Sequence, residues 1–257
     1  MKINDATDIR IGTTQASKVY MGSVQVWPAV VPPTPTQALI EGYVTSGTTS
    51  ITANLNNGIT VSMTIDSDDR FHLDSWSGTL TSLRNCFNNR SSIYYFTAFR
   101  IPTGNVTTME DMFVGCSNMA RFTTPACDVS NVTNINSMFR GCSSLSSLDL
   151  SMLPFSAVTR ATYCFDQCTS LMTLNLNNWD LSNVQYMTNF FPQTNSGVFA
   201  NNLSTVYINN SNTLNVLTNN LQSCGSSTNS WVYVPSTAVI VTPSHTYEWN
   251  SSQNKWV

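Results

Sequence analysis

A phenylalanine that recurs every 26 residues constrains the fold of this 257-residue chain more than any other feature. Two further apolar columns keep the same period. The three columns are Phe87, Phe113, Phe139, Phe165 and Phe191; Leu80, Val106, Val132, Val158 and Val184; and Leu83, Met109, Ile135, Ala161 and Met187. A fixed period of 20–50 residues over several copies is the signature of stacked repeats, in which neighbouring copies bury one another's apolar side chains.

Each repeat is predicted to contain a short helix and a short strand. One face of the helix is indicated by apolar residues at positions i, i+3, i+7 and i+10, which are Val132, Ile135, Phe139 and Cys142 in one copy. Ser130 or Asn131 would cap its start, and Gly141 suits the left-handed residue after its end. The strand follows as Leu145-x-x-Leu148-x-Leu150, which matches the pattern of leucine-rich repeats.

The predicted fold class is therefore an α/β solenoid of about six coils over residues 76–235. Its last coils are irregular: a strand triplet at Leu203, Val206 and Ile208, a helix pattern at Leu214, Leu217, Leu221 and Cys224, and a closing strand with Val232 and Val234. Terminal repeats are commonly atypical because they cap the core.

The block DVSNVTNINSMFRGCSSLSSLDLS at residues 128–151 resembles the BspA-like leucine-rich repeats of bacterial surface proteins. The likeness is strong over residues 102–191 and weaker over 76–101 and 192–235. The resemblance implies a leucine-rich-repeat solenoid whose role is adhesion or recognition, without catalysis.

Four further segments flank the repeats. We predict an N-terminal β anchor segment at 1–28, a proline-rich linker at 29–38, a small β module that caps the solenoid at 39–75, and a C-terminal β-hairpin at 236–257. Hairpin turns are expected at Gly22-Ser23 and at Asn57-Gly58. The anchor segment carries apolar residues that a hairpin alone cannot bury, so we expect them to contact a partner: Ile9, Ile11, Val19, Val24, Val26 and Trp27.

The stretch IRIGTTQASKVYMGSVQVWP also resembles N-terminal segments of tailed-phage virion proteins. Together with the adhesion repeat, and with no hydrophobic signal segment near Met1, it favours a non-enzymatic virion structural protein, either a head or tail fibre or a decoration protein. The expected partners are virion proteins, a host surface protein or glycan, and further copies of the chain. The alternatives are a bacterial cell-surface adhesin and an intracellular protein-interaction scaffold.

Strand residues that alternate with the core triplets are predicted to form an outward recognition surface, joined by the aromatic C-terminal hairpin. Ordinary solvated positions, with aromatic rings that only pack sideways, are the alternative for each residue. The candidate recognition residues are Tyr95, Thr97, Arg121, Thr123, Asp149, Asn175, Tyr207, Trp231, Tyr233, Tyr247, Trp249 and Trp256.

Composition argues against other classes of function. The chain has 11 Lys and Arg against 14 Asp and Glu and no basic run, which disfavours nucleic-acid binding. No apolar stretch approaches the roughly 18 residues of a membrane helix. There is no G-x-S-x-G motif and no phosphate-binding glycine loop, so we expect neither enzymatic activity nor a cofactor. Asp66, Asp68 and Asp69 lack the later ligands of a calcium loop and are predicted to form a hairpin turn.

Seven cysteines raise the question of disulfides or zinc. Cys116, Cys142 and Cys168 share one repeat column, and Cys86 and Cys164 share another. On stacked helices, equivalent residues would lie about 8–10 Å apart, beyond the ~7 Å that a disulfide tolerates between Cα atoms. We therefore predict buried, reduced thiols rather than disulfides or a metal site.

Overall fold

The computed structural model describes residues 10–11, 14–15, 19–21, 24–27, 39–56, 58–73, 78–100, 102–192, 202–219, 238–250 and 255–256. The chain divides into two compact units, Met1–Gln37 and Ala38–Val257.

The first unit contains two antiparallel strand pairs. β1 (Arg10–Ile11) pairs with β2 (Thr14–Gln15), and β3 (Val19–Met21) pairs with β4 (Val24–Trp27). The second pair confirms the predicted hairpin around Gly22-Ser23 at the level of the backbone.

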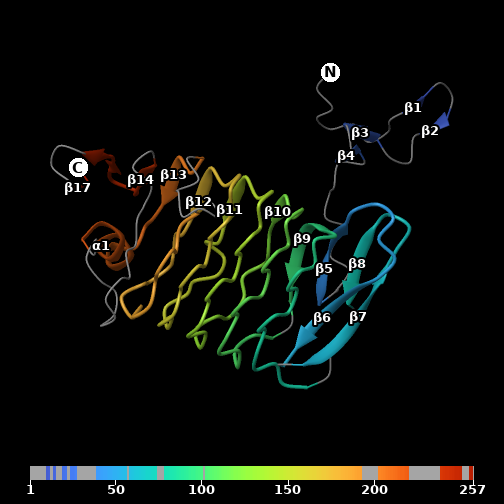
Figure 1. The fold of residues 1–257 in the computed structure, drawn as a ribbon, viewed down its shortest axis with the longest axis horizontal. Helices are drawn as coiled ribbons and strands as arrows, with labels where there is room; N and C mark the ends of the chain where they lie inside the picture. The colour runs from blue at the N-terminus through green and yellow to red at the C-terminus, as the bar shows by residue number, and fades with distance from the viewer. Residues whose placement is uncertain are drawn as a thin grey trace. The chain divides into compact units, whose positions relative to one another are not determined.

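The second unit begins with a six-stranded sheet in the order β10-β9-β5-β8-β7-β6 (Figure 1). Its strands are β5 (Ile40–Val44), β6 (Ile51–Leu55), β7 (Ile59–Ile65), β8 (Arg70–Leu73), β9 (Ile93–Phe99) and β10 (Arg121–Phe122). β6 and β7 pair antiparallel, with Leu55 opposite Ile59, which confirms the hairpin predicted at Asn57-Gly58. Asp66 Oδ1 accepts hydrogen bonds from the backbone N–H groups of Asp68 and Arg70, and this confirms the predicted turn between β7 and β8.

A second, five-stranded sheet has the order β11-β12-β13-β14-β15. Its strands are β11 (Ser147–Asp149), β12 (Thr173–Asn175), β13 (Thr205–Tyr207), β14 (Val239–Val241) and β15 (Thr246–Tyr247). β11 to β14 run parallel, with β11 and β12 at the same position of successive 26-residue repeats, and β15 returns antiparallel. The strand beside β13 is β14 and not the predicted strand at Val232 and Val234, a segment outside the described residues. β16 (Trp249–Asn250) and β17 (Lys255–Trp256) form the predicted C-terminal hairpin.

The expected α/β solenoid is wrong. The described part of the chain is predominantly β, with the curled six-stranded sheet, the second sheet and one α-helix, α1 (Ser211–Asn219). α1 covers Leu214 and Leu217 of the predicted irregular helix, and Leu221 and Cys224 lie outside the described residues. The segments expected to be helical in the regular repeats are successions of tight turns (Figure 1).

Hydrogen bonds between repeats explain why these segments are not helices. In one repeat, Ile135, Ser137, Phe139 and Gly141 donate their N–H groups to carbonyls of the next repeat over 2.8–2.9 Å. The N–H groups between them, such as those of Met138 and Arg140, donate to carbonyls three residues earlier. An α-helix would instead direct these N–H groups to carbonyls four residues earlier in the same segment. The backbones therefore stack at the spacing of strands and not of packed helices.

Left-handed residues enforce this geometry. Asp111, Ser137 and Tyr163, at one position of successive repeats, have φ values of 56°, 54° and 59°. Gly115 and Gly141 have φ values of 69° and 74°. Because left-handed residues interrupt a right-handed helix, a helix cannot continue through residues 137–141. The glycines thus adopt the predicted left-handed conformation, although no helix precedes them.

The predicted core columns are confirmed. Apart from the half-buried Val184, all members of the Phe, Val and Leu/Met columns are buried, as are Leu145, Leu148 and Leu150. The rings of Phe113, Phe139 and Phe165 stack along the repeats with centroids 5.4 and 6.0 Å apart. Neighbouring repeats therefore share one continuous apolar core.

Two elements cap this core. Strand β6 lies against the first repeat, where Asn54 and Asn56 donate backbone hydrogen bonds to the carbonyls of Cys86 and Ser82. At the last repeats, Thr213 of α1 is fully buried and donates its hydroxyl to the carbonyl of Trp179 over 2.6 Å.

Candidate recognition surface

The outward face of the six-stranded sheet brings Tyr95 and Arg121 together as predicted. They are direct partners in the β9–β10 register, and the Arg121 guanidinium lies 5.2 Å from the centroid of the Tyr95 ring. Arg121 also donates a hydrogen bond to the Tyr95 hydroxyl. Tyr43, the β5 partner of Tyr95, packs edge-on against it with centroids 6.4 Å apart. Tyr95 therefore packs sideways as well as facing solvent.

Thr97 and Thr123 direct their hydroxyls to the backbone. Thr97 Oγ1 donates to the Glu41 carbonyl over 3.2 Å, and Thr123 Oγ1 donates to the Thr97 carbonyl over 3.3 Å. These bonds join neighbouring strands, so the two hydroxyl protons are already engaged within the protein.

Asp149, Asn175 and Tyr207 form one row across the second sheet. They are consecutive partners in the register of β11, β12 and β13. Asp149 and Asn175 each accept a backbone hydrogen bond from the residue two positions later, over 2.9 and 3.0 Å, which ends the strand in a turn. Tyr207 is 39% exposed, so this row offers one open aromatic ring beside polar groups.

The remaining predicted recognition residues either occupy other positions than expected or lie outside the described residues. The row continues from Tyr207 to Val241, the residue that occupies the position expected for Tyr233. Tyr247 packs edge-on against His245 with centroids 4.5 Å apart. Trp249 and Trp256 are direct partners in the β16–β17 pair, and their side chains are outside the described part. Trp231 and Tyr233 are outside it altogether.

The predicted anchoring residues are defined only through their strands. Ile11 lies in β1, Val19 in β3, and Val24, Val26 and Trp27 in β4. Ile9 and the side chains of the other five are outside the described part of the chain.

A polar groove that the sequence reasoning missed crosses the repeats on the side where successive repeats meet by single parallel bridges. Ser82, Thr108, Asn134, Arg160 and Tyr186 form these bridges. The groove has a volume of about 380 Å³ and is lined by Arg84, Thr107, Thr108, Glu110, Thr133, Asn134, Thr159 and Arg160. The 26-residue column Thr81, Thr107, Thr133 and Thr159 was the signal that could have revealed it.

The charges of the groove are unevenly compensated. Glu110 Oε2 accepts a hydrogen bond from Asn134 Nδ2 over 3.1 Å and lies 3.4 Å from Arg84 Nε. The Arg160 guanidinium lies 5.6 Å from the centroid of the Tyr186 ring. Within the described residues no carboxylate pairs with Arg160. Arg84 and Glu110 thus form an ion pair at one end of the groove, and Arg160 gives the other end a net positive charge.

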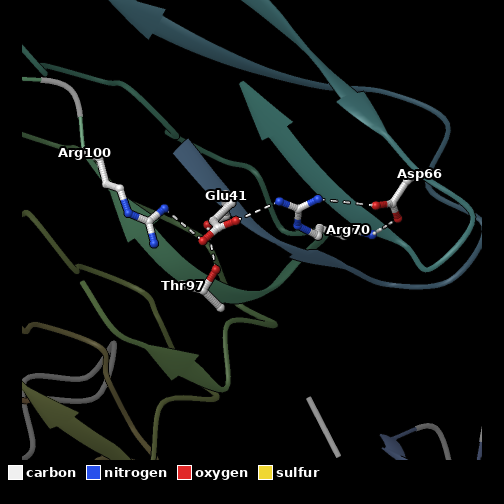
Figure 2. A network of polar contacts seen from close by, with 5 residues as sticks. All are labelled: Glu41, Asp66, Arg70, Thr97 and Arg100. Atoms are coloured by element: carbon white, nitrogen blue, oxygen red, sulfur yellow. Dashed lines mark hydrogen bonds and ion pairs between the residues drawn. The ribbon is translucent and has the colours of Figure 1, made fainter. Parts of the chain in front are cut away.

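An ion cluster around the buried carboxylate of Glu41 supports the sheet that begins the second unit (Figure 2). Glu41 is 3% exposed, and its two carboxylate oxygens accept hydrogen bonds from Arg100 Nη1 over 3.0 Å and Arg70 Nη2 over 2.9 Å. Arg70 also lies 3.7 Å from Asp66 at the β7–β8 turn. Because each partner lies on a different element, the cluster ties β5 to β8 and to the end of β9.

The described cysteines are free thiols. Cys116, Cys142 and Cys168 are buried, and each donates its S–H to a phenylalanine carbonyl of the preceding repeat over 3.1–3.2 Å. The predicted 8–10 Å separation between equivalent residues is wrong, because the repeats stack at strand spacing. The thiols are instead occupied as hydrogen-bond donors. Burial raises the pKa of Cys116 and of Cys168 to about 12.

Native-state alkylation should follow this burial. At pH 8, iodoacetamide should leave Cys116, Cys142 and Cys168 unmodified in the folded protein, because a raised thiol pKa keeps the thiolate scarce and the core excludes the reagent. Half-buried Cys127 should react first. After denaturation without reductant, mass spectrometry should find all four labelled. A disulfide-linked peptide containing any of the first three would contradict the hydrogen-bonded thiol ladder.

No group of three or more His, Cys, Asp or Glu side chains within the described residues is arranged to hold a metal ion. α1, the helix that the structure describes, has nine residues and is too short to cross a membrane.

Residues 81–206 match the model of a family described as "Mycoplasma protein of unknown function, DUF285", which is associated with BspA-like repeat proteins. The matched segment contains the regular 26-residue repeats, the groove and most of the row across β11 to β13. No curated protein and no solved structure matches the chain.

Proposed function

We propose that the protein is a non-enzymatic recognition component of a phage virion, a fibre or decoration protein that binds a host surface protein or glycan through its repeats. The observation that carries the proposal is how the repeats distribute their side chains. Apolar columns fill the interior, and the exposed columns are rows of hydroxyl, amide and charged groups. A stack of this kind presents a long, regular surface that is suited to binding.

The separation of Met1–Gln37 from the repeat-bearing unit supports separate roles for the two units, attachment for the first and recognition for the second. In this proposal the N-terminal unit attaches to other virion proteins, and further copies of the chain assemble beside it. Its resemblance to phage virion segments and its apolar residues, among them Val24, Val26 and Trp27, support this role.

A bacterial cell-surface adhesin is the second candidate. The BspA-like character of residues 128–151 and the family match over 81–206 favour it. Genomic neighbourhood separates the two candidates, since capsid, portal or tail genes beside this one are expected only for the virion protein.

Deletion of residues 1–28 tests the anchoring role. The truncated chain should be lost from purified particles, because the attachment surface is gone, while the melting temperature of the repeat unit stays unchanged. Quantitative mass spectrometry of particles and thermal unfolding measure the two outcomes. Deletion of the C-terminal residues 251–257 is the matched control and should leave incorporation intact. Full occupancy of particles by the chain that lacks residues 1–28 would refute the anchoring role.

A further inference from the structure

We propose that the polar groove across the repeats binds a linear oligosaccharide that carries a carboxylate group. The proposal deepens the recognition function, on which it rests, by naming the site and the class of ligand. It places the ligand in the groove and not on the outward sheet face around Tyr95 and Tyr207.

The lining of the groove argues for a carbohydrate rather than a peptide. All of the lining side chains are polar or charged, and the apolar atoms they offer are threonine methyls and arginine stems. Peptide-binding sites rely on apolar pockets that take anchoring side chains, and this groove has none among its lining residues. A ligand covered in hydroxyl groups matches such a surface because each hydroxyl both donates and accepts hydrogen bonds.

The threonine column presents acceptors at a regular spacing. The hydroxyls of Thr107, Thr133 and Thr159 each donate to the threonine carbonyl of the preceding repeat, over 3.5, 3.3 and 3.2 Å. Because their protons point to the backbone, the oxygen lone pairs are left to accept from a ligand. The repeats stack at about 4.8 Å, so a chain of sugars lying along the column would meet one such oxygen per repeat.

Glu110 adds a stronger acceptor at one end. Both described polar contacts of its carboxylate, from Asn134 and Arg84, fall on Oε2. Within the described residues Oε1 receives no donor. Charge-assisted hydrogen bonds from sugar hydroxyls to this oxygen would fix that end of the ligand.

Arg160 is the residue that favours a ligand with a negative charge. It is exposed, it has no carboxylate partner among the described residues, and its stacking on Tyr186 holds the guanidinium in place. A planar guanidinium donates two parallel hydrogen bonds to the two oxygens of a carboxylate, and a neutral sugar has no carboxylate to accept them. Tyr186 is 43% exposed and offers ring surface beside this contact.

Calorimetry with the full chain tests the inference. The probes are acidic oligosaccharides, with uronic-acid and sialic-acid members, and the methyl ester of each acid at the same length. We expect the acids to bind at least tenfold more tightly than their esters, with affinity falling as NaCl rises because the contact is exposed to solvent. Arg160→Gln should abolish the preference for acid over ester, and Arg160→Lys should restore part of it. Glu110→Gln should weaken both ligands.

Matched variants on the sheet face separate this inference from the recognition function itself. Tyr207→Ala and Asn175→Ala should leave oligosaccharide binding unchanged. All variants should remain folded because the replaced side chains are at least partly exposed, and Asn175→Ala alone should melt slightly earlier because it loses the hydrogen bond from the Asn177 N–H. If the sheet-face variants lose binding to host cells while Arg160→Gln keeps it, the groove is refuted and recognition by the repeats stands. No binding to any acidic probe, or equal binding of acids and esters, also overturns the inference.

Discussion

Replacing Phe139 by alanine is expected to lower the free energy of unfolding by about 3–5 kcal/mol. The ring is fully buried, stacks between Phe113 and Phe165, and meets Phe122 edge-on with centroids 5.1 Å apart. Its removal leaves a cavity in the shared core and breaks the aromatic column. Because each repeat is stabilised by its neighbours, hydrogen exchange should accelerate first around residues 113–165.

Tyr207→Ala is the matched control for this loss. It removes an aromatic side chain of similar size from an exposed position of β13, so its effect on the free energy of unfolding should stay within about 0.5 kcal/mol. Urea unfolding of both variants measures the difference. A Phe139→Ala protein as stable as the parent would show that the Phe column is not the core.

Glu41→Gln is expected to cost a similar amount, about 3–5 kcal/mol. The substitution keeps the shape of the side chain and removes the buried charge that Arg70 and Arg100 share, while Arg70 keeps its contact with Asp66. Removal of one partner from such a cluster is costly because the charges that remain lose a buried counter-ion. The six-stranded sheet should therefore loosen where β5 meets β8 and β9.

The exposed Arg84–Glu110 pair provides the comparison. Its side chains are 50% and 24% exposed, and Arg84→Gln should change the free energy of unfolding by about 0–1 kcal/mol. The double variant Glu41→Gln, Arg100→Gln should recover part of the loss, because it also removes one of the two positive charges that face Glu41. Equal, small effects of Glu41→Gln and Arg84→Gln would contradict a stabilising role for the buried cluster.

The sequence predicted the core and the short strands of the repeats correctly and their helices wrongly. The side chains that face inward must be apolar in every repeat, so they recur every 26 residues whatever the secondary structure of the repeat is. Apolar residues such as Val132, Ile135 and Phe139, however, satisfy both an amphipathic helix and a succession of turns. The choice between them depends on hydrogen bonds to the next repeat and on left-handed residues such as Ser137, and neither leaves a strong signal in one sequence.

The candidate site divides in the same way. Alternation along a strand and the repeat period together determine which outward residues form a row. For this reason the sequence correctly predicted two sets of neighbours: Tyr95 with Arg121, and Asp149 with Asn175 and Tyr207. Tyr233 was assigned to this row by extending the period, whereas the irregular last repeats place Val241 there. The groove was missed because the sequence analysis followed the apolar columns and the strand residues, and did not examine Thr107, Thr133 and Thr159 as one column.

Quantitative mass spectrometry of purified phage particles tests the proposed function most directly. Particles would be purified from cultures that express the gene, digested without prior enrichment, and compared with the envelope fraction of the same cells. We expect peptides from both units of the chain in the particles, at a fixed ratio to the major structural proteins. Their absence from particles, with the full chain recovered from the cell envelope instead, would contradict a virion role and favour the bacterial adhesin.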